Sequence, residues 1–191
     1  MMLGNYHRDE ILVEKELPLK YFAYSACFRR EAGSYRKEER GMIRGHQFNK
    51  IEMFQFTKPE QSWKAFAELI KNAEKLVEGL GLHYQTVQLA AGDSSAAMAK
   101  TCDIEVWLPS MNTYKEVSSV SNALDYQARR GNIRFKDSVT SKNEFVHTLN
   151  ASGLATSRLL PAILEQFQQP DGSVKVPKVL QKWVGKKLLK T

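Results

Sequence analysis

Two strands separated by a charged loop dominate the first third of the chain. The apolar, aromatic segment from Tyr21 to Phe28 predicts a strand that ends at Arg29, Arg30 and Glu31. The segment from Phe48 to Phe56 predicts a return strand. Because alternate residues of a strand share a face, Arg29 and Glu31 point the same way. On the return strand the shared face consists of Phe48, Lys50, Glu52, Phe54 and Phe56.

These positions combine side chains of three useful kinds. A flat aromatic ring can stack a base, a carboxylate can hold an ammonium group, and an arginine fork matches phosphate oxygens in two parallel hydrogen bonds. The alternative is a solvated hairpin loop, which is the common interpretation of a charge-rich segment.

A helix is predicted next. Thr57 is the expected N-cap, with Pro59 in the first turn and Glu60 closing a capping box. Gly79 and Gly81 are expected to end the helix. The apolar residues at helical spacing are Trp63, Phe66, Ile70, Ala73 and Val77, widened by Leu69, Leu76 and Leu80. We interpret this stripe as core that packs against a sheet.

The second half of the chain predicts further short strands. Asp103 to Leu108 alternates, with Ile104, Val106 and Leu108 on one face and Asp103, Glu105 and Trp107 on the other. A turn over Pro109–Asn112 leads to a strand from Tyr114 to Ser121. Residues 125–134 are mixed and suggest a short helix or loop. Strands joined by such turns favour an antiparallel sheet.

The last predicted strand runs from Phe145 to Ser152, with Thr148, Asn150 and Ser152 on one face. A helix from about Leu154 should bury Leu154, Leu159, Ile163 and Phe167. Pro161 should kink this helix or mark a late start. Together these elements predict one α+β domain over residues 1–191.

The composition is that of a globular protein. The 191 residues are 42% hydrophobic and 26% charged, and no apolar run approaches the roughly 18 residues of a membrane-spanning helix. The N-terminus lacks the apolar core of a signal peptide, so we expect a cytoplasmic protein. Cys27 and Cys102 suit a reducing compartment and do not have zinc-ligand spacing. A Walker A sequence is absent from the chain.

The positive charge is concentrated in the last 18 residues. Of the net charge of +7, six units come from Lys175, Lys178, Lys182, Lys186, Lys187 and Lys190, with no acid between Val174 and Thr191. Residues 1–173 therefore carry 22 basic and 21 acidic side chains, a net charge of +1. This tail could contact RNA phosphates through counterion release. A frayed, solvated terminus is the favoured interpretation.

Three ordered segments resemble one family. The sequences FRREAGSY, RGHQF and KIEMF resemble the second signature motif of class II aminoacyl-tRNA synthetases, and in detail that of the seryl-tRNA synthetases. Residues 112–134 resemble the nucleotide-contacting strand of that family and the polar segment after it. Residues 145–158 resemble the third signature motif, a strand that enters a helix carrying an arginine. The resemblance covers the chain from about Asp9 onward.

This resemblance implies a fold and a reaction. The fold is α+β, a class II synthetase-like antiparallel β-sheet flanked by helices and truncated on its N-terminal side. The reaction is activation of serine with ATP to seryl-adenylate, followed by transfer to tRNA(Ser), with Mg²⁺ as the accompanying metal. Such chemistry needs positioning and charge neutralisation more than a protein nucleophile.

The resemblance also implies residue roles. Arg29 would grip the α-phosphate and Arg158 the γ-phosphate, and these two are the expected catalytic residues. The expected ATP-binding set is Arg29, Arg30, Glu31, Phe48, Glu116, Val117, Ser118, Ser119 and Arg158. Phe48 would stack the adenine, and Glu31 would lie near it. The expected serine-binding set is Glu52, Asn150 and Ser152, and Glu116 is the expected magnesium ligand.

Some family elements have no counterpart in the sequence. These are the N-terminal helical arm for tRNA, the first signature motif of the dimer interface, and a Thr-x-Glu element that binds serine. We therefore expect the chain to be the C-terminal part of a catalytic domain, for which the family's homodimer is doubtful. One alternative is a module that binds nucleotide or serine without charging tRNA. A second alternative is a relative that loads amino acids onto carrier proteins. Such relatives use a zinc site with cysteine, which this sequence does not contain.

Overall fold

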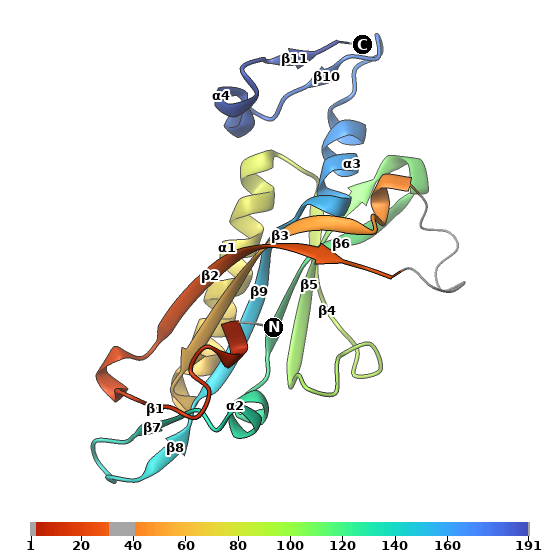
Figure 1. Cartoon of the computed structure of the whole chain (residues 1–191). Coiled ribbons are helices and arrows are strands. Elements are labelled where there is room, and N and C mark those ends of the chain that lie inside the picture. Colours follow the sequence, from red (N-terminus) through yellow and green to blue (C-terminus); the bar gives the residue numbers. More distant parts are fainter. Residues whose placement is uncertain (1–2, 31–40, 191) are drawn as a thin grey trace.

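A six-stranded antiparallel sheet forms the centre of the molecule (Figure 1). The computed structural model describes residues 3–30 and 41–190. In sheet order the strands are β2 (Leu19–Phe28), β3 (Gln47–Thr57), β9 (His147–Ala155), β6 (Thr113–Asn122), β5 (Lys100–Leu108) and β4 (Tyr84–Gln88). Every neighbouring pair is antiparallel. The predicted antiparallel α+β fold is confirmed.

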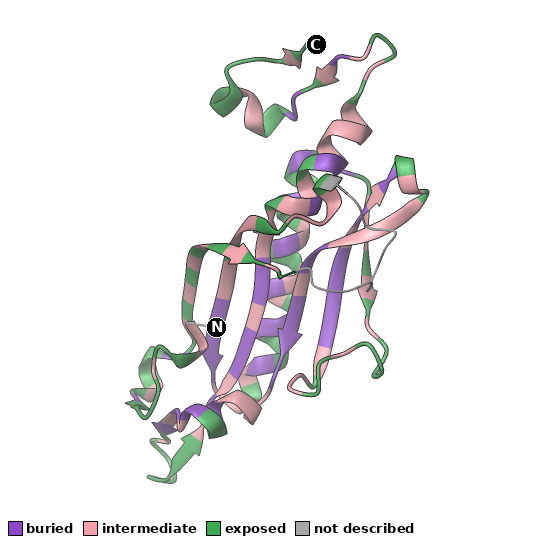
Figure 2. Ribbon diagram, turned by 45° about the vertical axis from the view of Figure 1, so that its right-hand side comes forward, coloured by how far each residue is buried: buried purple, intermediate pink, exposed green. Residues whose placement is uncertain are grey.

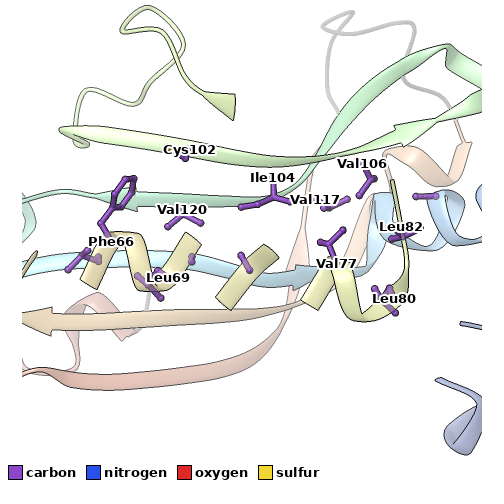
Figure 3. Packing of buried hydrophobic residues seen from close by; sticks show 14 of the residues in the cluster. Phe66, Leu69, Val77, Leu80, Leu82, Cys102, Ile104, Val106, Val117 and Val120 are labelled. Atoms are coloured by element: carbon purple, nitrogen blue, oxygen red, sulfur yellow. The ribbon is translucent and has the colours of Figure 1, made fainter. Parts of the chain in front are cut away.

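Two helices, α1 (Ser62–Leu80) and α3 (Thr156–Phe167), pack against the sheet. The core between α1 and the sheet is apolar and completely shielded at its centre (Figure 3). It contains Phe66, Leu69 and Val77 from α1, and Ile104, Val106, Val120 and Leu149 from the strands. The alternation from Asp103 to Leu108 therefore predicted the buried face of β5 correctly, since Ile104, Val106 and Leu108 are fully buried.

The N-terminus of α1 differs from the prediction. The helix follows a 3₁₀ turn, η4 (Pro59–Gln61), and no side chain caps its N-terminus. Thr57 is the last residue of β3, where it pairs with His147, so the predicted N-cap and capping box are wrong. At the other end Gly81 takes the left-handed conformation with φ 73°, and its N–H reaches the carbonyl of Glu78.

The apolar stripe of α1 is narrower than predicted. Trp63 is 50% exposed and Leu76 is 42% exposed, so neither belongs to the core. The buried line is instead Ala65, Phe66, Leu69, Ala73, Val77 and Leu80.

The region around residue 146 also differs. The predicted strand from Phe145 is divided into β8 (Asn143–Phe145) and β9, and Leu154 lies in β9 rather than in the following helix. β8 pairs with β7 (Arg134–Lys136), which also pairs in parallel with β1 (Ile11–Leu12). These strands and α2 (Tyr126–Gly131) surround a second apolar cluster that includes Phe54, Phe56 and Phe135. α3 begins at Thr156 and holds Pro161 in its interior.

The lysine-rich tail is folded, so the expectation of a frayed terminus is wrong. It consists of β10 (Val174–Lys175), η6 (Lys178–Leu180), α4 (Gln181–Val184) and β11 (Leu188–Leu189), with β10 and β11 paired antiparallel. This segment extends beyond the end of α3 (Figure 1). Its six lysines are exposed, whereas Val176 is buried.

Four short 3₁₀ turns complete the described elements: η1 (Leu3–Asn5), η2 (Glu14–Glu16), η3 (Gly41–Ile43) and η5 (Pro109–Met111). Buried positions are concentrated on the central strands and on α1, and the C-terminal segment is mostly exposed (Figure 2). Within residues 3–30 and 41–190, no helix is both long and apolar enough to cross a membrane.

Candidate active site

The face of the sheet that packs on α1 is apolar, whereas the opposite face is polar except where Phe54 and Phe56 of β3 join the second apolar cluster. Along β3, β9, β6 and β5, the residues that alternate with the core positions place their side chains on the face opposite α1. Glu52 lies opposite Ser152, Asn150 opposite Ser121, and Ser119 opposite Asp103. A row of hydroxyl, amide and carboxylate groups therefore crosses four strands.

Glu52 is the centre of a cluster of hydrogen-bond donors. Asn150 Nδ2 donates to Glu52 Oε1 at 3.0 Å, and Ser152 Oγ donates to Oε2 at 3.4 Å. Lys50 Nζ lies 2.9 Å from Oε2 of the same carboxylate, whose side chain is 16% exposed. The structure thus joins all three predicted serine-binding residues through Glu52, and adds Lys50.

Arg29 and Phe48 face each other where β2 ends and β3 begins. The main-chain N–H of Arg29 donates to the carbonyl of His46 at 2.7 Å, which extends the pairing of Cys27 with Phe48. The Arg29 guanidinium lies 4.8 Å from the centroid of the Phe48 ring. The adjoining Arg30 is exposed, and Glu31 lies outside the described residues. Arg29 and Phe48 line a cavity of about 90 Å³ together with Lys50, Ser152 and Arg158.

Arg158 enters the site from the first turn of α3. Two hydroxyls tie this turn to the hairpin: Thr156 Oγ1 accepts from the N–H of Asn49 at 3.1 Å, and Ser157 Oγ donates to the carbonyl of Ile43 at 3.2 Å. The Arg158 side chain is only 8% exposed, and its Nη1 donates to the main-chain carbonyl of Glu116 at 2.9 Å. The guanidinium is therefore held in place on the wall of the site.

The run from Glu116 to Ser119 is divided between the two faces. Glu116 and Ser119 line a cleft, whereas Val117 packs in the core on the side of α1. The Ser118 hydroxyl is buried and donates to the carbonyl of Ser152 at 2.6 Å. A β-bulge explains the division, because Val117 is an extra residue where Ile104 and Glu105 pair with Ser118 and Glu116. Two residues three positions apart can thus share the polar face.

That cleft has a volume of about 680 Å³. Its lining includes three carboxylates from β5 and β6, Asp103, Glu105 and Glu116, and the guanidinium of Arg158. Burial raises the pKa of Asp103 to about 6, helped by the charges of Glu116 and Glu105 and opposed by Ser119 and Arg158. One oxygen of Asp103, Oδ1, has no hydrogen-bond partner in the described part of the chain.

Asp103, Glu105 and Lys50 were not among the predicted site residues. Their positions on the polar faces of β5 and β3 were visible in the alternation, which was the available signal. Carboxylate oxygens suit Mg²⁺, which commonly uses one or two protein carboxylates and completes its shell with phosphate and water. Residues 3–30 and 41–190 contain no preformed group of three or more metal-ligating side chains. Glu116 is one of the carboxylates that line the cleft, and its role as a magnesium ligand stays a prediction.

Comparison with known proteins agrees with this geometry. The chain is 73% identical over 184 residues to a serine–tRNA ligase 2 of Clostridium acetobutylicum, and 55% identical over 181 residues to a serine–tRNA ligase of Desulforamulus reducens. These alignments cover 96% and 95% of this chain and 43% of each relative, so the chain spans less than half of their length.

Solved structures give the same result. A seryl-tRNA synthetase from Pyrococcus horikoshii, complexed with ATP, superposes with a TM-score of 0.93 at 46% identity, over 98% of this chain and 42% of that one. A cytoplasmic serine–tRNA ligase from Naegleria fowleri in complex with AMP superposes with a TM-score of 0.90 at 41% identity. This superposition covers 98% of this chain and 45% of that one. The sequence model of the family described as "tRNA synthetase class II core domain (G, H, P, S and T)" matches residues 2–167 of this chain. This protein belongs to the class II tRNA synthetase core domain family.

Proposed function

We propose that this chain forms the ATP- and serine-binding part of a cytoplasmic serine–tRNA ligase. The complete protein would activate serine with ATP to seryl-adenylate and transfer the seryl group to tRNA(Ser). One observation carries the serine assignment: Asn150 and Ser152 both donate to the Glu52 carboxylate, beside the cavity lined by Arg29 and Phe48. The similarity to serine–tRNA ligases supports it independently.

The proposed chemistry is displacement at phosphorus. An oxygen of the serine carboxylate attacks the α-phosphorus of ATP, the bond to the β-phosphate oxygen breaks, and pyrophosphate leaves. Arg29 neutralises charge on the α-phosphate, and Arg158 binds the γ-phosphate. Phe48 stacks the adenine, and the Arg29 guanidinium lies 4.8 Å from the centroid of the same ring. No protein nucleophile is needed.

Glu52 selects the amino acid. A partly buried carboxylate surrounded by donors favours a ligand that brings its own ammonium or hydroxyl hydrogen. Asn150 and Ser152 fix the orientation of the carboxylate. An amino acid without a side-chain hydroxyl would leave polar groups of this cluster unpaired.

Mg²⁺ bound with ATP would neutralise charge on the phosphates. We assign this role to Glu116, which lines the cleft together with Ser119. The Val117 and Ser118 side chains face away from the cleft, so any part they take in ATP binding is through the main chain. The proposed roles of Arg30 and Glu31 are contacts with ATP from the loop.

A pair of reaction-intermediate analogues tests this proposal. Calorimetry on the full-length protein would compare non-hydrolysable seryl-adenylate with alanyl-adenylate, which differ only in the hydroxyl group. We expect the seryl analogue to bind at least about 100-fold more tightly, because the alanyl analogue leaves buried polar groups unpaired. Equal affinity for the two analogues would contradict serine recognition at Glu52.

A further inference from the structure

Lys50 is a charged residue of the candidate site to which the proposed function assigns no role. It lies two positions from Glu52 on β3, so the two side chains share the polar face. Lys50 Nζ is 2.9 Å from Glu52 Oε2, and the two side chains are 28% and 16% exposed. The pair is therefore shielded but not sealed from solvent.

Small residues surround this ion pair. On β2, Ser25 lies opposite Lys50 and Ala23 lies opposite Glu52. On β9 the corresponding partners are Ala155 and Ser152. Because none of these side chains is long enough to cover the charges, both remain accessible from the polar face of the sheet.

Lys50 also lines the cavity that contains Arg29, Phe48 and Arg158. Lys50 thus contacts the Glu52 cluster and shares a cavity with the arginines assigned to phosphate. Along β3 the order is an aromatic ring at Phe48, a positive charge at Lys50 and a negative charge at Glu52.

Stability alone does not account for this arrangement. A partly exposed ion pair typically contributes about 0–1 kcal/mol, and Glu52 already has two neutral donors in Asn150 and Ser152. A positive charge that lines a cavity, beside a partly exposed negative charge, is complementary to a zwitterion. An α-amino acid carries its ammonium and carboxylate on one carbon and can present them in the opposite order.

We propose that Lys50 is a substrate-binding residue that binds the carboxylate of the amino-acid substrate, after first serving as the partner of Glu52 in the empty site. When the zwitterion enters, its ammonium takes the place of Lys50 at Glu52. The flexible lysine stem lets Nζ turn to the substrate carboxylate. Every charge keeps one opposite partner before and after binding. This inference rests on the proposed function.

Serine and serinamide distinguish the two charges of the substrate, because serinamide keeps the ammonium and hydroxyl but has a neutral amide in place of the carboxylate. Calorimetry would measure both ligands on the full-length protein and on its Lys50→Gln and Lys50→Arg variants. For Lys50→Gln we expect serine affinity to fall about 10- to 100-fold, the range for a lost hydrogen bond to a charged group. Serinamide affinity should change less than about threefold, and so should ATP affinity. Lys50→Arg, which keeps the charge, should restore most of the serine affinity.

Lys20→Gln is the matched control. Lys20 also lies on a strand of this sheet and pairs with an acid, Glu68, at 3.3 Å, but it is exposed and lies on the side of α1. This variant should bind both ligands like the unaltered protein. The unaltered protein itself should prefer serine to serinamide by at least about tenfold, which tests the inference even if Lys50→Gln does not fold.

Three results would overturn the inference. Equal losses for serine and serinamide would mean that Lys50 only orients Glu52. A comparable loss of ATP affinity would make it a phosphate ligand, and unchanged serine affinity would make it an ion-pair partner only. The proposed function is tested separately, because its failure would abolish serine-dependent activity in the unaltered protein, whatever the behaviour of the variants.

Discussion

Asn150 and Glu52, which are 98 positions apart in the sequence, are joined by a 3.0 Å hydrogen bond between β9 and β3. Asn150 uses only its Nδ2 in this bond. Its Oδ1 is buried and has no hydrogen-bond partner among the described residues. An unpaired buried acceptor beside a carboxylate is costly unless a ligand donates to it. The pair therefore presents acceptors to an incoming ammonium or hydroxyl.

Replacing Glu52 should separate serine recognition from ATP binding. Glu52→Gln keeps the size of the side chain but removes the charge that holds the ammonium. We expect serine affinity to fall about 100-fold, while ATP affinity changes less than about threefold. Calorimetry with each ligand measures both, and Glu68→Gln on α1 is the control. Equal losses for the two ligands would show that Glu52 does not bind serine.

Replacing Arg158 should weaken the binding of ATP more than the binding of AMP, because the γ-phosphate is the proposed ligand of Arg158. For Arg158→Ala we expect ATP affinity to fall at least about 10-fold and AMP affinity to change less than threefold. Because Arg158 is buried against Glu116, a thermal unfolding curve must accompany the binding measurements. The same loss for both nucleotides would contradict the γ-phosphate role.

Asp103 should make stability depend on pH. Its pKa is raised to about 6 by burial, whereas an aspartate in the unfolded chain titrates near 4. The native state therefore binds more protons than the unfolded state between these values, and the contribution of Asp103 to stability falls as pH rises from about 4 to 6. Asp103→Asn lacks this titration.

The measurement is urea unfolding of both proteins at pH 4 and pH 7.5. From pH 4 to pH 7.5, the free energy of unfolding of Asp103→Asn should rise by roughly 1–3 kcal/mol relative to that of the unaltered protein. A difference between the two proteins that does not change with pH would exclude the raised pKa.

Gly79 and Gly81 lie two residues apart and should respond oppositely to alanine. Gly79 is inside α1 with open space around it, so Gly79→Ala should stabilise the protein by roughly 0.5–1 kcal/mol. Gly81 has φ 73°, so Gly81→Ala should destabilise it by about 1–2 kcal/mol. Thermal unfolding compares them directly. Changes of the same sign would mean that α1 does not end at Gly81.

The fold was predictable where local pattern and tertiary environment agree. Ile104, Val106 and Leu108 alternate with polar residues in the sequence and are buried in the structure. Thr57 has the chemistry of an N-cap, but β3 continues through it to pair with His147, and the sheet determines its conformation. The tail was mispredicted because its structure depends on the pairing of two very short strands, β10 and β11, which its lysine-rich sequence does not indicate.

The sequence motif placed Arg29, Phe48 and Glu52 in order on two neighbouring strands, and their roles in binding stay predictions. The bulge at Val117 was not predictable, because it depends on how β6 pairs with β5. Strand alternation alone would place Glu116 and Ser119 on opposite faces. Strand alternation placed Lys50 and Glu52 on one face of β3. That their ion pair stays accessible depends on the small residues beside it on β2 and β9, which only the strand pairing reveals.

The most direct test of the account is amino-acid-dependent exchange of pyrophosphate into ATP by the full-length protein. Serine should support exchange, and alanine should support it at a rate lower by roughly 100-fold or more, because it lacks the hydroxyl that the cluster at Glu52 binds. Exchange that does not depend on serine, or that proceeds equally well with alanine, would contradict the central claim.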